Sequence, residues 1–141
     1  MYLEYNAKSI TCNRRLGVYF ASCIAHAPVG NNLMSTWTEF HWTSRWPRCH
    51  VGKVPDSTVY AKLFWEHDLE DVTFCDIVLV YSEPNDTLRG ALVEAGMGIA
   101  LCKKIVVVGE NYSYSTWQYH PAVMKAASLE EARVIMRVMA L

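Results

Sequence analysis

The 141-residue sequence has no large excess of charge of either sign. Its 13 lysine and arginine residues nearly balance its 14 aspartate and glutamate residues, which leaves a formal net charge of −1 and an isoelectric point of about 6.5. Proteins that bind the phosphate backbone of a nucleic acid normally carry a basic surplus. The composition therefore excludes a nucleic-acid polymer as the expected partner, but not a free nucleoside or nucleotide, for which one or two local contacts suffice.

Long apolar runs are also missing. No segment reaches the ~20 apolar residues that a membrane-spanning helix requires, and residues 1–15, which include Glu4 and Asn6, do not resemble a signal peptide. With 52% hydrophobic and 19% charged residues, the composition is that of a globular protein. We expect a cytoplasmic protein without membrane association, in which an N-terminal extension, residues 1–15, precedes a single domain, residues 16–141.

Paired cysteines are absent as well. The five cysteines are odd in number and widely spaced, and they form neither a C-x-x-C motif nor a zinc-ligand spacing with histidine. We expect reduced thiols, with Cys75 and Cys102 in the core because both fall in apolar stretches. The sequence predicts no metal site.

Glycine-rich phosphate-binding motifs are absent too. Gly90, Gly96 and Gly98 do not form G-x-G-x-x-G, and there is no P-loop. These glycines fit close packing of a helix on a sheet or close approach of a ligand. We expect no dinucleotide or other cofactor.

What the sequence does contain is an alternation of apolar and helical segments. Asp56 and Ser57 are N-cap candidates for a long helix, and Ser128 is one for the last helix. Residues 27–32 (Ala-Pro-Val-Gly-Asn-Asn) leave room for only a short helix after the first strand. Strands are expected at 16–22, 39–43, 76–81, 104–109 and, weakly, 122–126, helices at about 56–74, 88–102 and after 128, and loops at 45–55 and 110–121.

Strands that are almost wholly apolar and alternate with helices indicate a parallel sheet covered on both faces. We therefore expect an α/β protein, a flavodoxin- or Rossmann-like three-layer sandwich with a mainly parallel sheet of about five strands. Ligands of such folds bind at the carboxyl ends of the strands. The segments that we expect at that edge are Ser22–Ala25, Trp42–Trp46, Ser82–Arg89 and the loop after Gly109.

Asp68 interrupts the apolar side of the helix expected at 56–74. That side carries residues such as Phe64 and Trp65, whereas charged residues such as Glu66 lie opposite. A carboxylate in an apolar stripe costs several kcal/mol unless it is paired, hydrogen-bonded or facing a cavity. A catalytic carboxylate and a structural aspartate that caps a neighbouring loop both account for this position.

Glu94 is the only charged residue between Gly90 and Cys102, a segment in which every other residue is apolar. A helix that is apolar all round is expected to be largely buried. Glu94 lies about one turn from its start, where the helix dipole and loop amides would stabilise an anion. A structural carboxylate that accepts loop N–H groups is the alternative. Two carboxylates near the strand ends indicate glycosyl chemistry, in which one attacks an anomeric carbon and the other handles the proton of the leaving group.

Three segments, in this order and spacing, resemble the nucleoside 2-deoxyribosyltransferase family, whose relatives include the deoxynucleoside 5′-monophosphate N-glycosidases. The family has an aspartate in a D-L-x-x-(I/V) helix, a second aspartate eight residues later at the head of a strand, and a glutamate in an E-(L/I/A)-G-x-(A/G)-x-A-L helix. Here these are Asp68, Asp76 and Glu94, and Val18-Tyr19-Phe20-Ala21 matches an early strand of the family. The segments are Glu66-His-Asp-Leu-Glu-Asp-Val, Cys75-Asp-Ile-Val-Leu-Val and Arg89-Gly-Ala-Leu-Val-Glu-Ala-Gly-Met-Gly-Ile-Ala-Leu-Cys-Lys-Lys-Ile-Val-Val-Val.

The resemblance implies an enzyme that acts on the N-glycosidic bond of (deoxy)nucleosides or nucleotides. Glu94 would attack C1′ and form a glycosyl-enzyme, from which the sugar passes to another base or to water. Asp68 would be the acid/base and position the base, and Tyr19 would orient Glu94. The resemblance also implies a homo-oligomer, in which residues near Asn111 reach a neighbouring subunit's site.

The chain departs from the family at the sugar and phosphate positions. Leu88 stands where family transferases commonly carry an aspartate that binds the sugar hydroxyl, and Asp86 is the nearby candidate to replace it. No arginine follows the first strand, so Ser22, Arg45 and Arg89 are the candidates for binding a phosphate. These departures leave two alternatives open: a non-catalytic nucleotide-binding or sensing module, and an N-glycosidase that acts on NAD or a modified nucleotide.

The remaining candidates follow from residue type and position. Trp42 and Trp46 are expected where a base would stack, although packing in the core or at an interface is the more common role of such residues. Ser82 is a turn former that also suits contact with a sugar. The predicted substrate-binding residues are thus Ser22, Trp42, Arg45, Ser82, Asp86, Arg89 and Gly90.

Overall fold

The computed structural model of the chain describes residues 15–49 and 58–141. Almost all of the predicted N-terminal extension and the N-cap candidates Asp56 and Ser57 lie outside the described residues. The division into an extension and one domain therefore stays a prediction.

Five strands form one sheet in the order β2-β1-β3-β4-β5, and every neighbouring pair is parallel. The predicted α/β architecture is confirmed. The sequences of the three central strands are GVYFA, IVLVY and KIVVV. They are nearly continuous apolar runs, without alternating polar residues, because helices cover both faces of the sheet. The strands are β1 (Gly17–Ala21), β2 (His41–Trp42), β3 (Ile77–Tyr81), β4 (Lys104–Val108) and β5 (Val123–Ala126).

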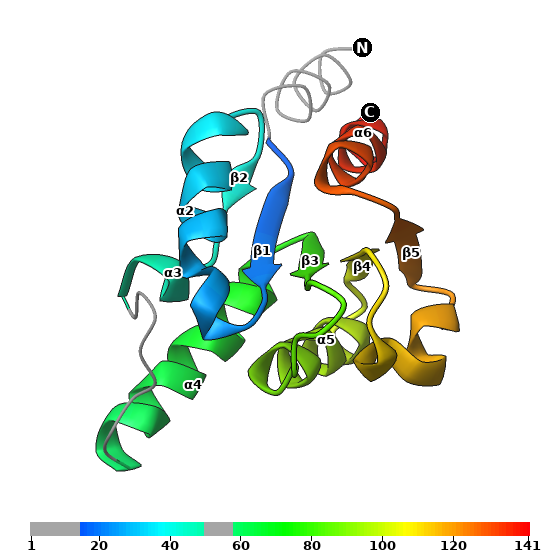
Figure 1. Cartoon of the computed structure of the whole chain (residues 1–141). Coiled ribbons are helices and arrows are strands. Elements are labelled where there is room, and N and C mark those ends of the chain that lie inside the picture. The colour runs from blue at the N-terminus through cyan, green and yellow to red at the C-terminus, as the bar shows by residue number, and fades with distance from the viewer. Residues whose placement is uncertain (1–14, 50–57) are drawn as a thin grey trace, which may run out of the picture.

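The helices form the two outer layers. Right-handed crossovers put α2 on one face of the sheet and α4 and α5 on the other, and α6 joins the α2 face, where Arg133 contacts Trp37 and Glu39 (Figure 1). Strand order reverses between β1 and β3, so the loops after these two strands diverge and leave a crevice between them. The helices are η1 (Ile24–His26), α2 (Ala27–Thr36), α3 (Trp46–Cys49), α4 (Thr58–Phe74), α5 (Gly90–Ala100), η2 (Tyr112–Tyr119) and α6 (Leu129–Met139).

Three expectations about local structure are wrong. Residues 27–32 do not shorten the first helix but begin it, because Pro28 lies in the first turn, where a missing N–H costs no hydrogen bond. Gly30 lies so close to Phe20 that a Cβ atom would be 2.7 Å from the ring. The expected loops at 45–55 and 110–121 contain α3 and η2, respectively.

The helix that reads as apolar all round is buried on one side only. Glu94, Ala95 and Gly98 of α5 face the sheet, whereas Val93 is 50% exposed and Leu101 40%. The expectation of a largely buried helix is wrong because α4 and the sheet cover only the inner side of α5.

The two cysteines expected in the core differ. Cys75 is buried, but Cys102 is exposed, with φ 60°, at the turn that ends α5. None of the helices in residues 15–49 and 58–141 combines the length and the apolarity that crossing a membrane takes.

Candidate active site

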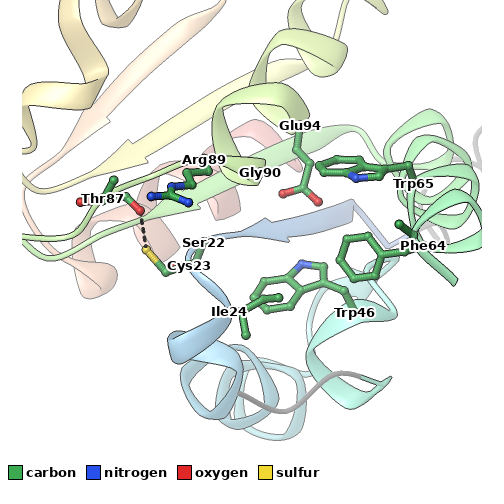
Figure 2. A pocket seen from close by; sticks show the side chains of 11 residues that line it. Ser22, Cys23, Ile24, Trp46, Phe64, Trp65, Thr87, Arg89, Gly90 and Glu94 are labelled. Carbon is green, nitrogen blue, oxygen red and sulfur yellow. Dashed lines mark hydrogen bonds between the residues drawn. The ribbon is translucent and has the colours of Figure 1, made fainter. Parts of the chain in front are cut away.

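A cavity of about 340 Å³ lies at the carboxyl ends of β1 and β3, in the crevice where the strand order reverses (Figure 2). Three of the four segments expected at this edge contribute to it, and α4 supplies a further wall. The lining residues are Ser22, Cys23, Ile24, Trp46, Ala61, Phe64, Trp65, Thr87, Arg89, Gly90 and Glu94.

Glu94 brings a carboxylate to this cavity from the first turns of α5, although only 4% of the residue is exposed (Figure 2). Tyr19, wholly buried on β1, donates its hydroxyl hydrogen bond to Glu94 Oε2. The two residues are 75 positions apart in the chain. The phenol thereby holds one carboxylate oxygen of a residue that lines the cavity.

Asp68 lies behind Glu94 on α4 and is 2% exposed. The two carboxyl groups are close enough for each to shift the pKa of the other. The Oδ2 atom of Asp68 has no hydrogen-bond partner among the described residues. Asp68 does not line the cavity, so it acts on a bound molecule only through Glu94 or through a movement of its own.

The two carboxyl groups titrate together. Burial raises the pKa of Asp68 to about 6, although hydrogen bonds with Glu94 and Tyr19 lower it. Burial first, and the charge of Asp68 second, raise the pKa of Glu94 well above its usual value, against the hydrogen bond from Tyr19. Two adjacent buried carboxylates do not both ionise readily, so near neutral pH the pair tends to hold one proton. Such a pair contains a base and an acid at one site.

One side of the cavity is an aromatic wall made by Trp46, Phe64 and Trp65 (Figure 2). The Trp46 ring stacks on Phe20, with centroids 5.8 Å apart, and its Nε1 donates to the Phe20 carbonyl at 2.6 Å. The Phe64 and Trp65 rings meet edge to face at 5.6 Å. These contacts hold the rings in place before any ligand binds.

The opposite side of the cavity is polar (Figure 2). Arg89 is the N-cap of α5, and its guanidinium makes no ion pair or hydrogen bond with any residue in 15–49 or 58–141. The Ser22 hydroxyl donates to the Tyr81 carbonyl at 2.6 Å, and Cys23 Sγ lies 3.5 Å from the Thr87 carbonyl. A free cation beside a helix N-terminus is suited to an anionic group.

Four of the seven predicted substrate-binding residues do not line the cavity. Trp42 donates to the Trp37 carbonyl and packs on the Trp37 and Phe40 rings. Arg45 pairs with the buried Asp71 through its backbone N, its Nε and an Nη2 contact at 2.8 Å. Ser22, Arg89 and Gly90 do line it. The substrate-binding roles of all seven stay predictions.

Ser82 and Asp86 are held in the loop between β3 and α5. Ser82 Oγ lies 2.7 Å from the Tyr114 hydroxyl. Asp86 Oδ2 accepts from the Glu83 backbone N and lies 2.7 Å from His26 Nε2. These bonds direct the Asp86 carboxylate to the loop after β1 and not to the cavity.

Asn111 braces the same loop from outside. Its Nδ2 donates to the carbonyls of Glu83 and Asp86, both at 3.0 Å, and its Oδ1 accepts from Ser113 N. The side chain is therefore fully bonded within its own chain. A role in a neighbouring subunit's site, as the family resemblance implies, would require it to leave these partners.

The sequence did not point to the contribution of α4 to the cavity. Phe64 and Trp65 read as core residues, yet they lie four and three positions before Asp68, and this helical spacing places them on its face. That spacing from Asp68 could have predicted that Phe64 and Trp65 line the cavity. Among residues 15–49 and 58–141, no group of three or more histidine, cysteine, aspartate or glutamate side chains is placed to hold a metal ion.

No family model matches the sequence, and no curated protein matches it. Among solved structures the fold resembles that of the CMP N-glycosidase BcmB of Clostridium botulinum, with a TM-score of 0.54 and 14% identity. The alignment covers 86% of this chain and 98% of that chain. The two proteins share a fold. That fold is related to the one implied by the sequence resemblance to deoxyribosyltransferases.

Proposed function

We propose that this protein cleaves the N-glycosidic bond of a nucleotide, with Glu94 as the nucleophile. One observation carries the proposal: the Glu94 carboxylate lies in the cavity between an aromatic wall and the cation of Arg89, which has no partner among the described residues (Figure 2). A nucleotide presents an aromatic base, an anomeric carbon and a phosphate in the same order.

Each part of a nucleotide has a suitable neighbour in this arrangement. The base would stack on the rings of Trp46, Phe64 and Trp65, since stacking on aromatic side chains contributes ~1–3 kcal/mol per base. The 5′-phosphate would lie at Arg89 and the N-terminus of α5. The cavity of about 340 Å³ is of the size expected for a small-molecule site.

The reaction would take place in two steps. A Glu94 carboxylate oxygen forms a bond to C1′ while the bond from C1′ to the base nitrogen breaks, and the electron pair of that bond leaves with the base, which takes up a proton. Water or a second base then attacks C1′ of the glycosyl ester and releases Glu94. In the water case a proton passes back to the site, so each cycle restores its starting charge.

Tyr19 and Asp68 would serve this chemistry beside Glu94. The Tyr19 hydroxyl holds the carboxylate in one orientation. Asp68, whose pKa of about 6 lies near neutrality, would turn toward the bound nucleotide, supply the proton for the departing base and take a proton back when water attacks. The fold is shared with a CMP N-glycosidase, which supports an activity on nucleotides.

The test is an incubation with ribo- and deoxyribonucleoside 5′-monophosphates and the parent nucleosides, with and without a second base. We expect release of the base from nucleotides, base exchange if the sugar passes to the second base, and loss of at least 10³-fold in activity for Glu94→Gln. Intact-mass measurement of the quenched reaction would show the sugar phosphate bound to the wild-type chain only. Full activity of Glu94→Gln, or no turnover of any compound, would refute the proposal.

A second candidate is a nucleotide-binding module that does not turn its ligand over. Leu88, buried at 4% exposure, stands where the related transferases carry an aspartate, and Asp86 is bonded to His26 instead of facing the cavity. Such a module would be stabilised thermally by nucleotides in both wild type and Glu94→Gln, and neither protein would release a base.

A further inference from the structure

The loop between β3 and α5, residues 82–89, contributes to the polar side of the cavity. It ends at Arg89, the N-cap of α5, whose side chain makes no capping hydrogen bond. Glu94 follows five positions later, so the placement of both residues depends on how this loop is held. A misplacement of ~1 Å at a reacting group costs ~10²-fold in rate. The contacts that fix the loop therefore bear on the proposed reaction.

Asp86 lies at the centre of these contacts. Its Oδ2 atom accepts from Glu83 N at 2.6 Å, and Asp86 N donates to the Glu83 carbonyl at 3.0 Å. From the side of η2, Asn111 Nδ2 donates to the Asp86 carbonyl at 3.0 Å. The carboxylate thus closes a turn within the loop, and it does not line the cavity.

His26 holds Asp86 from the opposite side of the crevice. Its Nε2 lies 2.7 Å from Asp86 Oδ2, its Nδ1 lies 3.9 Å from Glu83 Oε2, and its ring meets that of Tyr81 edge to face at 5.1 Å. Burial raises the pKa of Asp86, but the hydrogen bonds from Glu83 N and His26 outweigh this and hold the pKa below its usual value. Asp86 is therefore an ionised acceptor, and His26 is the donor. Hydrogen bonds to an ionised group are roughly twice as strong as those between neutral groups.

Two further contacts connect the segment after β1 with the segment after β3. Ser22 Oγ donates to the Tyr81 carbonyl at 2.6 Å, and Cys23 Sγ lies 3.5 Å from the Thr87 carbonyl (Figure 2). Ser22 reaches the end of the strand and not the loop, and a thiol is a weak donor. Of the three contacts, the one made by His26 is therefore the strongest to the loop itself.

From this geometry we infer that His26 is a positioning residue: through Asp86 it fixes the loop that places Arg89 and the start of α5 at the cavity. The inference rests on the proposed function. His26 does not line the cavity, so it affects the reaction without touching the nucleotide. The Asp86 carboxylate serves to join the two loops and not to bind the sugar.

The first experiment compares His26→Leu, which removes the donor, with His26→Gln, whose side-chain amide keeps one. We expect His26→Leu to lower kcat/KM for a nucleoside 5′-monophosphate at least tenfold, and His26→Gln to stay within about threefold of the wild type. His41→Leu is the matched control, because His41 is exposed and lies on β2 at the amino-terminal edge of the sheet. Equal losses in the two His26 variants, or no loss in either, would overturn the inference.

The second experiment measures the loop itself and does not depend on turnover. Cys23 is the reporter, because its thiol lies between the two loops and lines the cavity. In a background of Cys12→Ser, Cys49→Ser and Cys102→Ser, its rate of alkylation by N-ethylmaleimide should rise at least fivefold with His26→Leu and little with His26→Gln. All variants are compared well below their unfolding temperatures.

Ionisation of the thiol does not account for such a rise. Burial first, and the charge of Asp86 second, raise the pKa of Cys23, and His26→Leu leaves that charge in place. The remaining described thiol, Cys75, is buried. Faster alkylation would therefore report a wider separation of the loops.

The two experiments separate failure of this inference from failure of the proposed function. Absence of turnover by the wild type would refute the proposed function, and the alkylation rate would then decide the inference. An unchanged alkylation rate in His26→Leu would overturn the inference whether or not a nucleotide is cleaved. Faster alkylation with an unchanged kcat/KM would overturn it as well, because the contact would then hold the loops without positioning the site.

Discussion

Glu94, Asp68 and Tyr19 reach one point in the molecule from α5, α4 and β1, and their ionisation is linked. Each is at most 4% exposed, so burial raises the pKa of all three, and the negative charge of Asp68 adds to this effect for Glu94 and for Tyr19. A proton is held here more tightly in the folded chain than in the unfolded chain. The same property that suits proton transfer therefore makes the stability of the protein depend on pH.

The first prediction concerns that dependence. Because the pKa of Asp68 rises on folding from 3.8 to about 6, its carboxyl group stabilises the fold fully below about pH 4 and loses this contribution as pH rises through about 6. Urea unfolding at pH 4 to 8 should show Asp68→Asn gaining stability relative to wild type across this range. Glu66→Gln, an exposed position of the same helix, should show no such trend. A parallel pH dependence in all three proteins would contradict the prediction.

The second prediction separates the two arginines proposed for phosphate. Arg45→Met should lower the free energy of unfolding by about 1–3 kcal/mol, because the buried Asp71 loses the guanidinium and keeps only the backbone N–H of residue 45. It should leave the ratio of kcat/KM for a nucleotide over its nucleoside unchanged. Arg89→Met should bring that ratio close to one, because the phosphate would no longer contribute to recognition. The free energy of unfolding should change little, since Arg89 is exposed and has no partner among the described residues. The opposite pattern would place the phosphate at Arg45.

At the scale of single elements, α5 illustrates how one helix serves three demands. Its first turn carries the polar side of the cavity, its inner face approaches the sheet closely, and its last turn reverses the chain into β4. The close approach occurs at Gly98, where a Cβ atom would lie 2.8 Å from both Ile105 Cδ1 and Val78 Cγ2. Gly96, on the outer face, would meet nothing within 4 Å.

The third prediction uses these two glycines as a matched pair. Gly98→Ala should destabilise the protein by about 1–2 kcal/mol, because overpacking against the sheet outweighs the gain in helix propensity. Gly96→Ala should be neutral or stabilising by up to ~1 kcal/mol, since only propensity changes. Thermal and urea unfolding measure both. Equal effects of the two substitutions would show that packing does not distinguish them.

The fourth prediction concerns the end of the helix. Lys103 N donates to the Gly98 carbonyl at 2.8 Å, and Cys102 adopts φ 60° to allow this turn. A residue with a Cβ atom is strained there, so Cys102→Gly should raise the free energy of unfolding by about 1 kcal/mol. Cys102→Ala removes the thiol but keeps the Cβ atom, and it should give no gain. A gain in both variants would assign the effect to the thiol.

At the scale of the whole molecule, an ion cluster ties the C-terminal helix to the opposite part of the sheet. Glu39, just before β2, accepts from Arg133 Nε and Arg137 Nε of α6, both at 2.7 Å. Arg133 also lies over the Trp37 ring, 5.3 Å from its centroid. The cluster joins the first and last thirds of the described chain.

The fifth prediction follows from this cluster. The hydrogen bond from Arg133, above the other causes, lowers the pKa of Glu39 from 4.5 to about 2. The ionised Glu39 side chain therefore stabilises the folded protein fully above about pH 4.5, and this contribution is lost as pH falls through about 2. Glu39→Gln should therefore cost about 2 kcal/mol at pH 7 and much less at pH 2 to 3. Arg133→Met should cost less in the Glu39→Gln background than in the wild type, because the ion pair is already broken and only the contact with Trp37 remains to be lost. A constant cost at all pH values would refute the prediction.

The self-association implied by the family resemblance stays a prediction, and so does a cytoplasmic location. Light scattering of the full chain tests the first directly. The described surface offers exposed hydrophobic residues on three helices, among them Val59 and Phe74 of α4, Val93 of α5, and Val134 and Val138 of α6.

The sequence by itself determined the architecture and the central carboxylate. Apolar strands that alternate with helices suffice to predict a doubly covered parallel sheet, because that pattern depends on neighbours along the chain. The anomaly of Glu94 is likewise local, a single charge in an apolar helix, and so is that of Asp68 in its stripe. Both residues lie buried at the strand ends.

The tertiary structure decided which polar and aromatic side chains are free to meet a ligand. Arg45 is bonded to Asp71, 26 positions away, and Asp86 to His26, 60 positions away, whereas Arg89 is left without a partner among the described residues. A charged side chain pairs with whichever opposite charge the fold brings close to it. Because that partner is distant along the chain, neighbouring residues in the sequence do not reveal it. For the same reason, the structure and not the helical pattern decided that one side of α5 faces solvent.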